Sequence, residues 1–288
     1  MPCKTGEPTL ASDNLIARCV GQWSQDKVYY ISRYADIFSS SMKRKFADRE
    51  YIDLFAGPGR CVLSDGSREF DGTPLAALQI KVPFSRYHFV ESSSEEFNAL
   101  QTRARSSDRF PSICWYPEDA NSAATEIRKS LSADALALAL VDPTGLHFHF
   151  SSLQTLVQDR RVDLIYLFPD GMDVRRNLER YLKTDQLDVV LGTTSWRDKI
   201  TEELKKYPSL ADVAKCPGAT KIVFGIFKEQ LRTLGYSFIS AGDEIRFKNS
   251  KSAELYYLVF ASRHEKGHEF WNKIKVISPT GQRQLLYR

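Results

Sequence analysis

Five short apolar runs, each about the length of a buried strand, alternate with helical stretches through the middle of this chain. The runs cover residues 51–55, 87–90, 113–116, 136–141 and 164–168. The stretches of helical character between them cover residues 74–80, 95–105, 120–131 and 152–157. Strands that alternate with helices predict βαβ units, and therefore a parallel sheet with right-handed crossovers. Thr73-Pro74 predicts a helix start, with Thr73 as the N-cap.

The last third of the chain narrows the choice of fold class further. A helix is expected near residues 221–234, followed by strands at 236–247 and 254–261 and a last helix at 265–275. The polar turn KNSKSA links the two strands as a hairpin. Five parallel βα units that end in a hairpin are the architecture of class I methyltransferases. We therefore predict a mostly parallel seven-stranded Rossmann-like sheet with an antiparallel terminal hairpin and helices on both faces.

The segments outside this alternation suggest a domain organisation. Residues 1–14 look like a flexible arm, and apolar residues at helical spacing follow from Trp23 to about Phe46. We therefore expect an N-terminal arm and helical cap at 1–48, and a methyltransferase-like domain at 49–288. Residues 170–218 break the rhythm of strands and helices, and are expected to form a helical insertion.

Composition excludes several classes of protein. The 288 residues carry a net charge of only +4, which argues against a surface coated with positive charge but leaves room for a local basic groove. The five cysteines are odd in number and show no CxxC spacing, so we expect free thiols, with no disulfide framework and no metal site. Without a signal-like or membrane-spanning apolar segment, the expected location is the cytoplasm.

The motif YIDLFAGPGR at 51–60 carries the strongest functional signal. Glycines after a buried strand let the backbone approach a ligand at the carboxyl edge of the sheet. The predicted cofactor-binding residues here are Asp53, Phe55, Ala56, Gly57, Pro58 and Gly59. The long polar segment that follows, up to Gly72, disfavours a dinucleotide and suits S-adenosylmethionine, whose ammonium Asp53 would bind. The alternatives are a plain glycine turn and a loop-bracing role for Asp53.

Acidic residues follow the next two strands. Glu91 ends the second run, where a carboxylate binds ribose hydroxyls in nucleoside-binding α/β folds. Asp119 and Ala120 follow the third run, where an adenine amino group would bind. The alternatives are an acid that complements a helix dipole at Glu91 and a helix N-cap at Asp119.

Asp142 and Pro143 end the fourth run and are the predicted catalytic residues. In amino-group methyltransferases this turn orients the target amine, and the chemistry is mainly positioning. The usual second proline and aromatic residue are replaced by Thr144 and Gly145, so Phe148 or Phe150 would have to supply a stacking surface. The alternative is a simple proline turn. Without a cysteine near this turn, a C5-cytosine methyltransferase is excluded.

Two further features follow along the chain. His147 and His149 would face the same side of a strand, most simply as structural histidines. A basic patch follows the fifth run and would suit a nucleic-acid backbone, although a solvated helix face is the commoner cause. It consists of Arg175, Arg176, Arg180 and Lys183.

The sequence resembles the three-Cys-motif partner family (TcmP) from about Trp23 to its end. The resemblance is carried by WSQDKVYYISRYADIF, YIDLFAGPG, GTPLAAL, VDPTG and YYLVFASRHEKGHEFWNKI. It implies a methyltransferase-like Rossmann fold and association with a second, radical-SAM-like protein that carries three cysteines. By motif match it implies that Asp53, Phe55, Gly57 and Gly59 line the cofactor, and that Asp142-Pro143 forms the catalytic turn.

Two functions remain open from the sequence. The first is a methyltransferase that uses S-adenosylmethionine to methylate an amino group on nucleic acid. The second is a non-catalytic or accessory subunit that docks the three-Cys-motif protein. A nucleotide-dependent oxidoreductase is disfavoured because the glycine loop is too long for a phosphate-binding turn.

Overall fold

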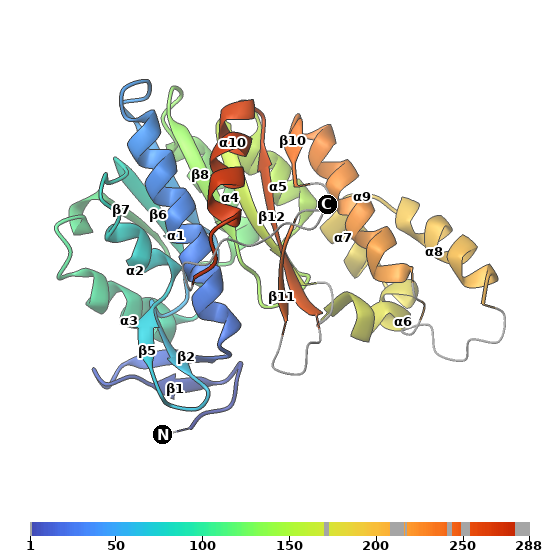
Figure 1. The fold of residues 1–288 in the computed structure, drawn as a ribbon, viewed down its shortest axis with the longest axis horizontal. Coiled ribbons are helices and arrows are strands. Elements are labelled where there is room, and N and C mark those ends of the chain that lie inside the picture. The colour runs from blue at the N-terminus through green and yellow to red at the C-terminus, as the bar shows by residue number, and fades with distance from the viewer. Residues whose placement is uncertain are drawn as a thin grey trace.

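The computed structural model describes residues 2–169, 173–207, 216, 218–240, 244–248 and 254–279. Its centre is a sheet in which these residues give the strand order β10-β12-β9-β8-β3-β6-β7 (Figure 1). The parallel strands are β3 (Arg49–Asp53), β6 (Arg86–Val90), β7 (Ile113–Tyr116), β8 (Leu136–Val141) and β9 (Arg161–Phe168). An antiparallel strand, β12 (Glu254–Ser262), pairs with β9. This strand order confirms the predicted fold class.

The terminal hairpin is also confirmed, with one refinement. The strand expected at 236–247 consists of two short pieces, β10 (Phe238–Ile239) and β11 (Ile245–Lys248). Each pairs antiparallel with a different end of β12, so together they occupy the place of one edge strand. The turn expected near Gly242 lies outside the described residues.

Helices cover both faces of the sheet because its strands are apolar on both sides. Leu138 and Leu140 of β8 belong to one buried cluster, whereas Ala137 and Ala139 belong to the other. The first face packs against α1 (Trp23–Met42), α2 (Thr73–Leu78), α3 (Ser94–Ala104) and α10 (Glu265–Lys275). The second face packs against α4 (Ala120–Ser130), α5 (Phe150–Val157) and α9 (Ala219–Thr233).

The N-terminal helix α1 is part of this cover. The hydroxyl of Tyr34 on α1 donates a hydrogen bond of 2.6 Å to the buried carboxylate of Asp163 on β9. Burial raises the pKa of Asp163 to about 6. Tyr34 also contacts Phe260 of β12 and Trp271 of α10. The expected helical cap therefore packs directly against the sheet, and its position brings Trp23 and Lys27 toward the carboxyl ends of the strands.

A second, smaller sheet was not predicted. Its order is β1-β2-β4-β5, and it joins the N-terminal segment to the segment after the glycine motif. The strands are β1 (Pro8–Leu10), β2 (Ile16–Val20), β4 (Arg60–Leu63) and β5 (Glu69–Asp71). Two expectations were therefore wrong. Residues 1–14 were expected to form a flexible arm, but they include β1. The long polar segment before Gly72 was expected to be a loop, but it contains β4 and β5.

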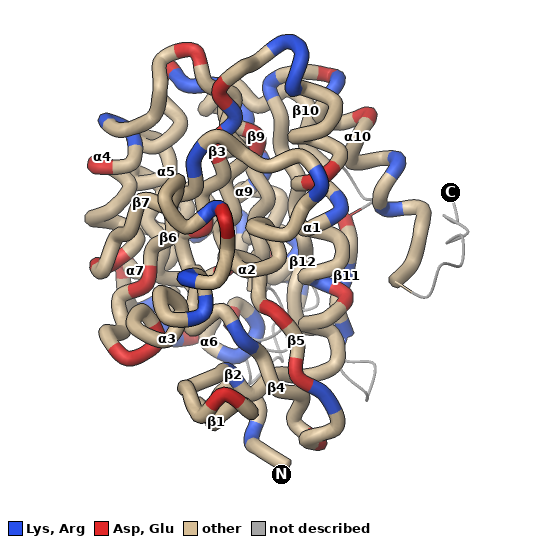
Figure 2. The backbone as a smooth tube through the Cα atoms, turned by 90° about the vertical axis from the view of Figure 1, so that its left-hand side faces the viewer, with Lys and Arg blue, Asp and Glu red and all other residues tan. Residues whose placement is uncertain are grey.

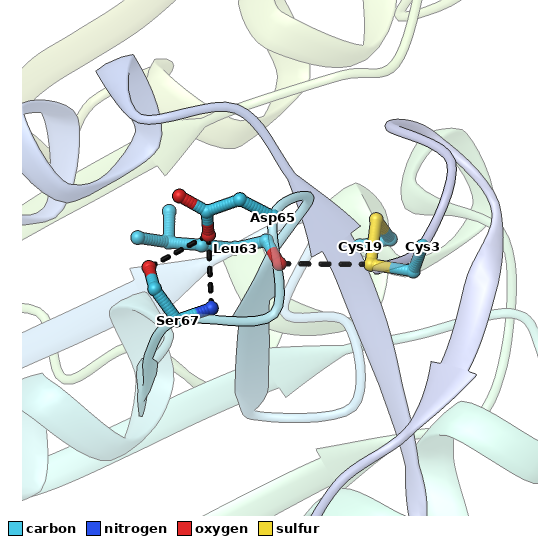
Figure 3. Close-up of a disulfide and its surroundings, with 5 residues drawn as sticks. All are labelled: Cys3, Cys19, Leu63, Asp65 and Ser67. Atoms are coloured by element: carbon cyan, nitrogen blue, oxygen red, sulfur yellow. Dashed lines mark hydrogen bonds between the residues drawn. A yellow bond between two sulfur atoms is a disulfide. The ribbon is translucent and has the colours of Figure 1, made fainter. Parts of the chain in front are cut away.

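A disulfide joins Cys3 to Cys19 at the edge of this small sheet (Figure 3). Cys19 lies on β2, and the backbone of Gly6 and Glu7 hydrogen-bonds with it in both directions. The expectation of five free thiols was wrong for this pair because the spacing of 16 residues gives no sign of the strand pairing that brings the two cysteines together. Cys61, Cys114 and Cys216 have free thiols.

The segment expected as a helical insertion forms three helices in its described part: α6 (Arg175–Lys183), α7 (Gln186–Leu191) and α8 (Ser195–Lys205). Arg197 ties them together, because its guanidinium binds the Asp188 carboxylate and the Leu182 carbonyl. Trp196 is fully buried and donates to Asp188 at 2.6 Å. Residues 170–172, 208–215 and 217 lie outside the described part of the insertion.

Candidate functional site

The glycine loop after β3 lies at the carboxyl edge of the sheet. Backbone bonds from Leu54 to β8 and from Ala56 to β6 fix its course. Gly57 and Gly59 have φ values of +63° and +78°, a region that side chains with a Cβ atom rarely adopt. A Cβ atom on Gly59 would lie 2.7 Å from Leu100, so this position also needs glycine for space. Phe55, Ala56, Gly57, Pro58 and Gly59 all line one large cleft.

Asp53 lies behind this loop, fully buried. Its carboxylate accepts a hydrogen bond of 2.6 Å from the Thr73 hydroxyl and one of 3.3 Å from the Phe55 amide. Burial, with a smaller contribution from Asp142, raises its pKa to about 7. These bonds hold the loop from behind, while the binding of an ammonium by Asp53 stays a prediction. The prediction that Thr73 is the N-cap of α2 was wrong. Gly72 takes that position, and the Thr73 side chain turns to Asp53.

Glu91 follows β6 and is buried beside the loop. One of its carboxylate oxygens accepts from the Gly57 amide at 2.9 Å, and the other accepts from the Ser93 amide at 2.8 Å. Burial raises the pKa of Glu91, while the Ser93 bond and the Arg18 guanidinium oppose that change. Each oxygen keeps accepting capacity, so this carboxylate has the chemistry to accept from ribose hydroxyls.

A small pocket of about 110 Å³ connects the predicted nucleoside-binding residues. Its lining includes Phe55, Glu91, Asp119 and Ala120, together with His147, which was not predicted as a site residue. The His147 ring packs edge-on against Phe55 with 5.6 Å between centroids, and burial lowers its pKa. The histidines do not alternate on a strand as expected, because residues 144–149 form a turn into α5.

The carboxylate of Asp119 also has a structural role. As the N-cap residue of α4, it accepts a bond of 2.8 Å from the Asn121 amide. Because it caps the helix and lines the small pocket at once, the two interpretations of this residue are compatible. Ala120 is nearly fully buried and also lines this pocket.

Asp142 and Pro143 end β8, next to β3 in the sheet, and line the large cleft of about 980 Å³. The Asp142 carboxylate forms a close ion pair with Lys27 of α1. Phe148 and Phe150 do not offer the stacking surface considered for them, because both are buried in the core. The aromatic lining of the cleft is instead Trp23, Phe55, Phe247 and Tyr256.

Two cations from the N-terminal segment complete the site and were missed by the sequence analysis. Arg18 on β2 binds Glu96 at 2.8 Å, lies 3.5 Å from Glu91, and lines both pockets. Lys27 pairs with Asp142. The only local signal was weak: Arg18 lies between the buried residues Ala17 and Cys19 in a strand-like alternation too short to predict.

The basic helix α6 exposes Arg175, Arg176, Arg180 and Lys183, as its sequence predicts. It lies at the same edge of the molecule as the small sheet and β11 (Figure 1). Arg176 is close enough to Tyr256 on the cleft wall for its charge to lower the pKa of that phenol, against burial, which raises it to about 12. Along the backbone that faces the viewer, the positions of basic and acidic residues are interspersed (Figure 2).

Two kinds of feature were not found within the described residues. No group of three or more His, Cys, Asp or Glu side chains there is arranged to hold a metal ion. No helix in that part of the chain combines the length and apolar character needed to cross a membrane.

No family model matches the chain, and no curated protein matches it. Among solved structures, it is similar to a Legionella pneumophila protein of the DUF519 family, with a TM-score of 0.52 at 9% identity over 91% of this chain and 95% of that one. An O-methyltransferase from Bacillus cereus in complex with SAH gives 0.44 at 8% identity, over 80% of each chain. TYW2 from P. horikoshii, in complex with MeSAdo, gives 0.42 at 11%, over 91% and 74%.

The strand order itself defines the class of fold: a mostly parallel, Rossmann-like α/β sheet with an antiparallel terminal hairpin, the architecture predicted from the sequence. At identities this low, likeness to solved structures concerns the fold alone. The resemblance to the three-Cys-motif partner family has no matching family model behind it.

Proposed function

We propose that this protein binds S-adenosylmethionine and transfers its methyl group to an amino group on nucleic acid. The observation that carries the proposal is the meeting of three strand ends at connected pockets: the Gly57 loop, Glu91 and the Asp142-Pro143 turn. This is the crevice where ligands bind in open α/β sheets. When bound, the cofactor supplies a methyl group activated on a sulfonium.

The small pocket fits a nucleoside in the chemistry of its lining. Glu91 offers carboxylate oxygens for ribose hydroxyls, and Leu54, Phe55 and Val90 offer apolar surface for a base. Gly57 lines the large cleft beside this pocket, and its amide holds the Glu91 carboxylate in place. In the large cleft, Asp142 would accept a hydrogen bond from the target amine and orient its lone pair.

The cofactor claim is tested by isothermal titration with S-adenosylmethionine and S-adenosylhomocysteine. We expect both to bind the full chain, and Glu91→Ala to weaken both by about tenfold or more, because ribose hydroxyls would lose their acceptor. Glu126→Ala is the matched control, since that side chain is exposed and pairs with Lys129 on the same helix. Folded protein that releases no heat with either ligand would refute the claim.

Nucleic acid as the acceptor is supported by the exposed cations of α6, one of which, Arg176, lies close enough to Tyr256 of the cleft lining to influence its pKa. The triple variant Arg175→Gln, Arg176→Gln, Arg180→Gln should reduce the salt dependence of single-strand binding by about 2 in log–log slope. Fluorescence anisotropy with a labelled oligonucleotide at several salt concentrations measures it. The matched control neutralises Lys43, Arg44 and Lys45, which are exposed beyond the far end of α1. Equal slopes in both variants would argue against α6 as the contact.

The second candidate is an accessory subunit that docks a three-Cys-motif protein, as the family resemblance implies. The observation that favours it is the state of the predicted catalytic turn. The Asp142 carboxylate is already paired with Lys27, and Thr144-Gly145 replaces the usual proline and aromatic residue. The discriminating variant is Asp142→Ala. This candidate is supported if cofactor binding and co-purification with the partner survive, while wild-type protein transfers no labelled methyl group to DNA, RNA or protein.

A further inference from the structure

The ion pair between Lys27 and Asp142 joins two parts of the chain that are 115 residues apart. Lys27 comes from the first turns of α1, before the methyltransferase-like sheet begins, and Asp142 comes from the carboxyl end of β8. Both side chains line the large cleft, with exposed fractions of only 13% and 14%. The pair therefore places one positive and one negative charge, largely withdrawn from water, in the wall of the predicted cofactor and acceptor site.

Both charges act well beyond the pair itself. Asp142 raises the pKa of buried Asp53 and of Cys61, whereas Lys27 lowers the pKa of each. Asp53 braces the glycine loop from behind, and Cys61 lies on the small sheet across the cleft. The two charges of the pair thus act in opposite directions on the pKa of Asp53 and on that of Cys61. A ligand in the cleft would experience both as well.

We propose that the net charge of the Lys27–Asp142 pair sets the selectivity of this cleft between a sulfonium ligand and the corresponding neutral thioether. The inference rests on the proposed function, because it concerns the charge of that cofactor. While paired, the two charges largely offset each other. Removing Lys27 leaves an unpaired carboxylate that attracts a cation, and removing the Asp142 charge leaves an unpaired ammonium that repels one.

The test is isothermal titration of the full chain with S-adenosylmethionine and S-adenosylhomocysteine, which differ by one methyl group and one positive charge. The quantity compared is the ratio of the thioether Kd to the sulfonium Kd. Lys27→Met should raise this ratio about fivefold or more, and Asp142→Asn should lower it by a similar factor. The double variant should return the ratio close to the wild-type value, since it again carries no net charge at the pair.

A ratio of affinities keeps the test independent of folding yield, because a loss of active protein affects both titrations equally. The matched control is Arg33→Met on the same helix, an exposed residue that contacts Tyr29 outside the cleft, and its ratio should not change. Equal weakening of both ligands, or a double variant far from the wild-type ratio, would overturn the inference. Absence of binding by wild-type protein would instead refute the proposed function and this inference with it.

Discussion

The two walls of the candidate site differ in origin. One wall includes the carboxyl ends of β6 and β8, where the carboxylates Glu91 and Asp142 lie. The other comes from the N-terminal segment, and it brings Arg18 and Lys27 to those same carboxylates. The chain thus supplies the counter-charges of its own cleft. A cationic cofactor would enter a site whose acids are already paired, so its affinity depends on both walls.

The largest expected effect concerns the main-sheet wall. Asp53 has a pKa raised to about 7 by burial, so its protonated form is favoured in the folded state. Stability is then highest below the unfolded pKa and falls as pH rises toward 7. Asp53→Asn keeps an oxygen for Thr73 but cannot ionise. The variant should therefore gain stability relative to wild type by about 4 kcal/mol between pH 4 and pH 8.

Urea unfolding at several pH values measures this gain. Asp134→Asn is the control, since the Asp134 side chain is 98% exposed and its replacement should leave the pH profile unchanged. If the difference in unfolding free energy between Asp53→Asn and wild type does not change with pH across this range, the pKa of Asp53 is not raised in the folded protein.

The contrast between the walls also separates what the sequence predicts from what it does not. The strands of the main sheet appear as apolar runs because both of their faces are buried, and the runs at Ile113–Tyr116 and Leu136–Val141 match the structure residue for residue. Glu91 and Asp142 follow from that pattern, because parallel strands bring their carboxyl ends to one edge.

The N-terminal wall depends on pairing between distant segments, which no local period reveals. Parallel pairing of Arg18 with Cys61 inserts the start of the chain beside a segment that looked like a polar loop. Its strands are three to five residues long, too short for a periodic signal. The position of Arg18 follows from this pairing, and the disulfide follows from the contact of Cys19 with Gly6 and Glu7, so both were missed.

The next expected effect concerns the N-terminal wall. Reducing the Cys3–Cys19 disulfide frees a segment with a sequence separation of 16, which corresponds to about 3 kcal/mol in the chain-entropy model. We expect a reductant to lower the free energy of unfolding by up to about that amount, and to speed amide exchange across β1 and β2. Exchange in β3 and β8 should change less, which would show that the two walls differ in stability.

Hydrogen exchange with mass spectrometry, with and without reductant, makes the comparison. The double variant Cys3→Ser, Cys19→Ser is the control, because its exchange should no longer respond to reductant. A wild-type protein whose exchange pattern is unaffected by reductant would show that the small sheet is held by its pairing alone.

The smallest expected effect compares one glycine from each wall. Gly59 in the main-sheet loop and Gly6 in the N-terminal segment both have positive φ values, +78° and +91°. A Cβ atom on Gly59 would lie 2.7 Å from Leu100 and 3.1 Å from Leu75, whereas one on Gly6 meets nothing within 4 Å. Alanine adds backbone strain of about 1 kcal/mol at each position, but it adds overpacking of about 1–2 kcal/mol only at Gly59.

Gly59→Ala should therefore lose more stability than Gly6→Ala, and the difference reports packing because φ is positive at both positions. Thermal and urea unfolding of both variants give that difference. In a Leu100→Ala background, Gly59→Ala should cost less stability than it does in wild type, since removing the Leu100 side chain opens the space that the new Cβ needs. Equal losses at Gly6 and Gly59 would mean that the glycine loop is set by backbone conformation alone, with no close contact to α3.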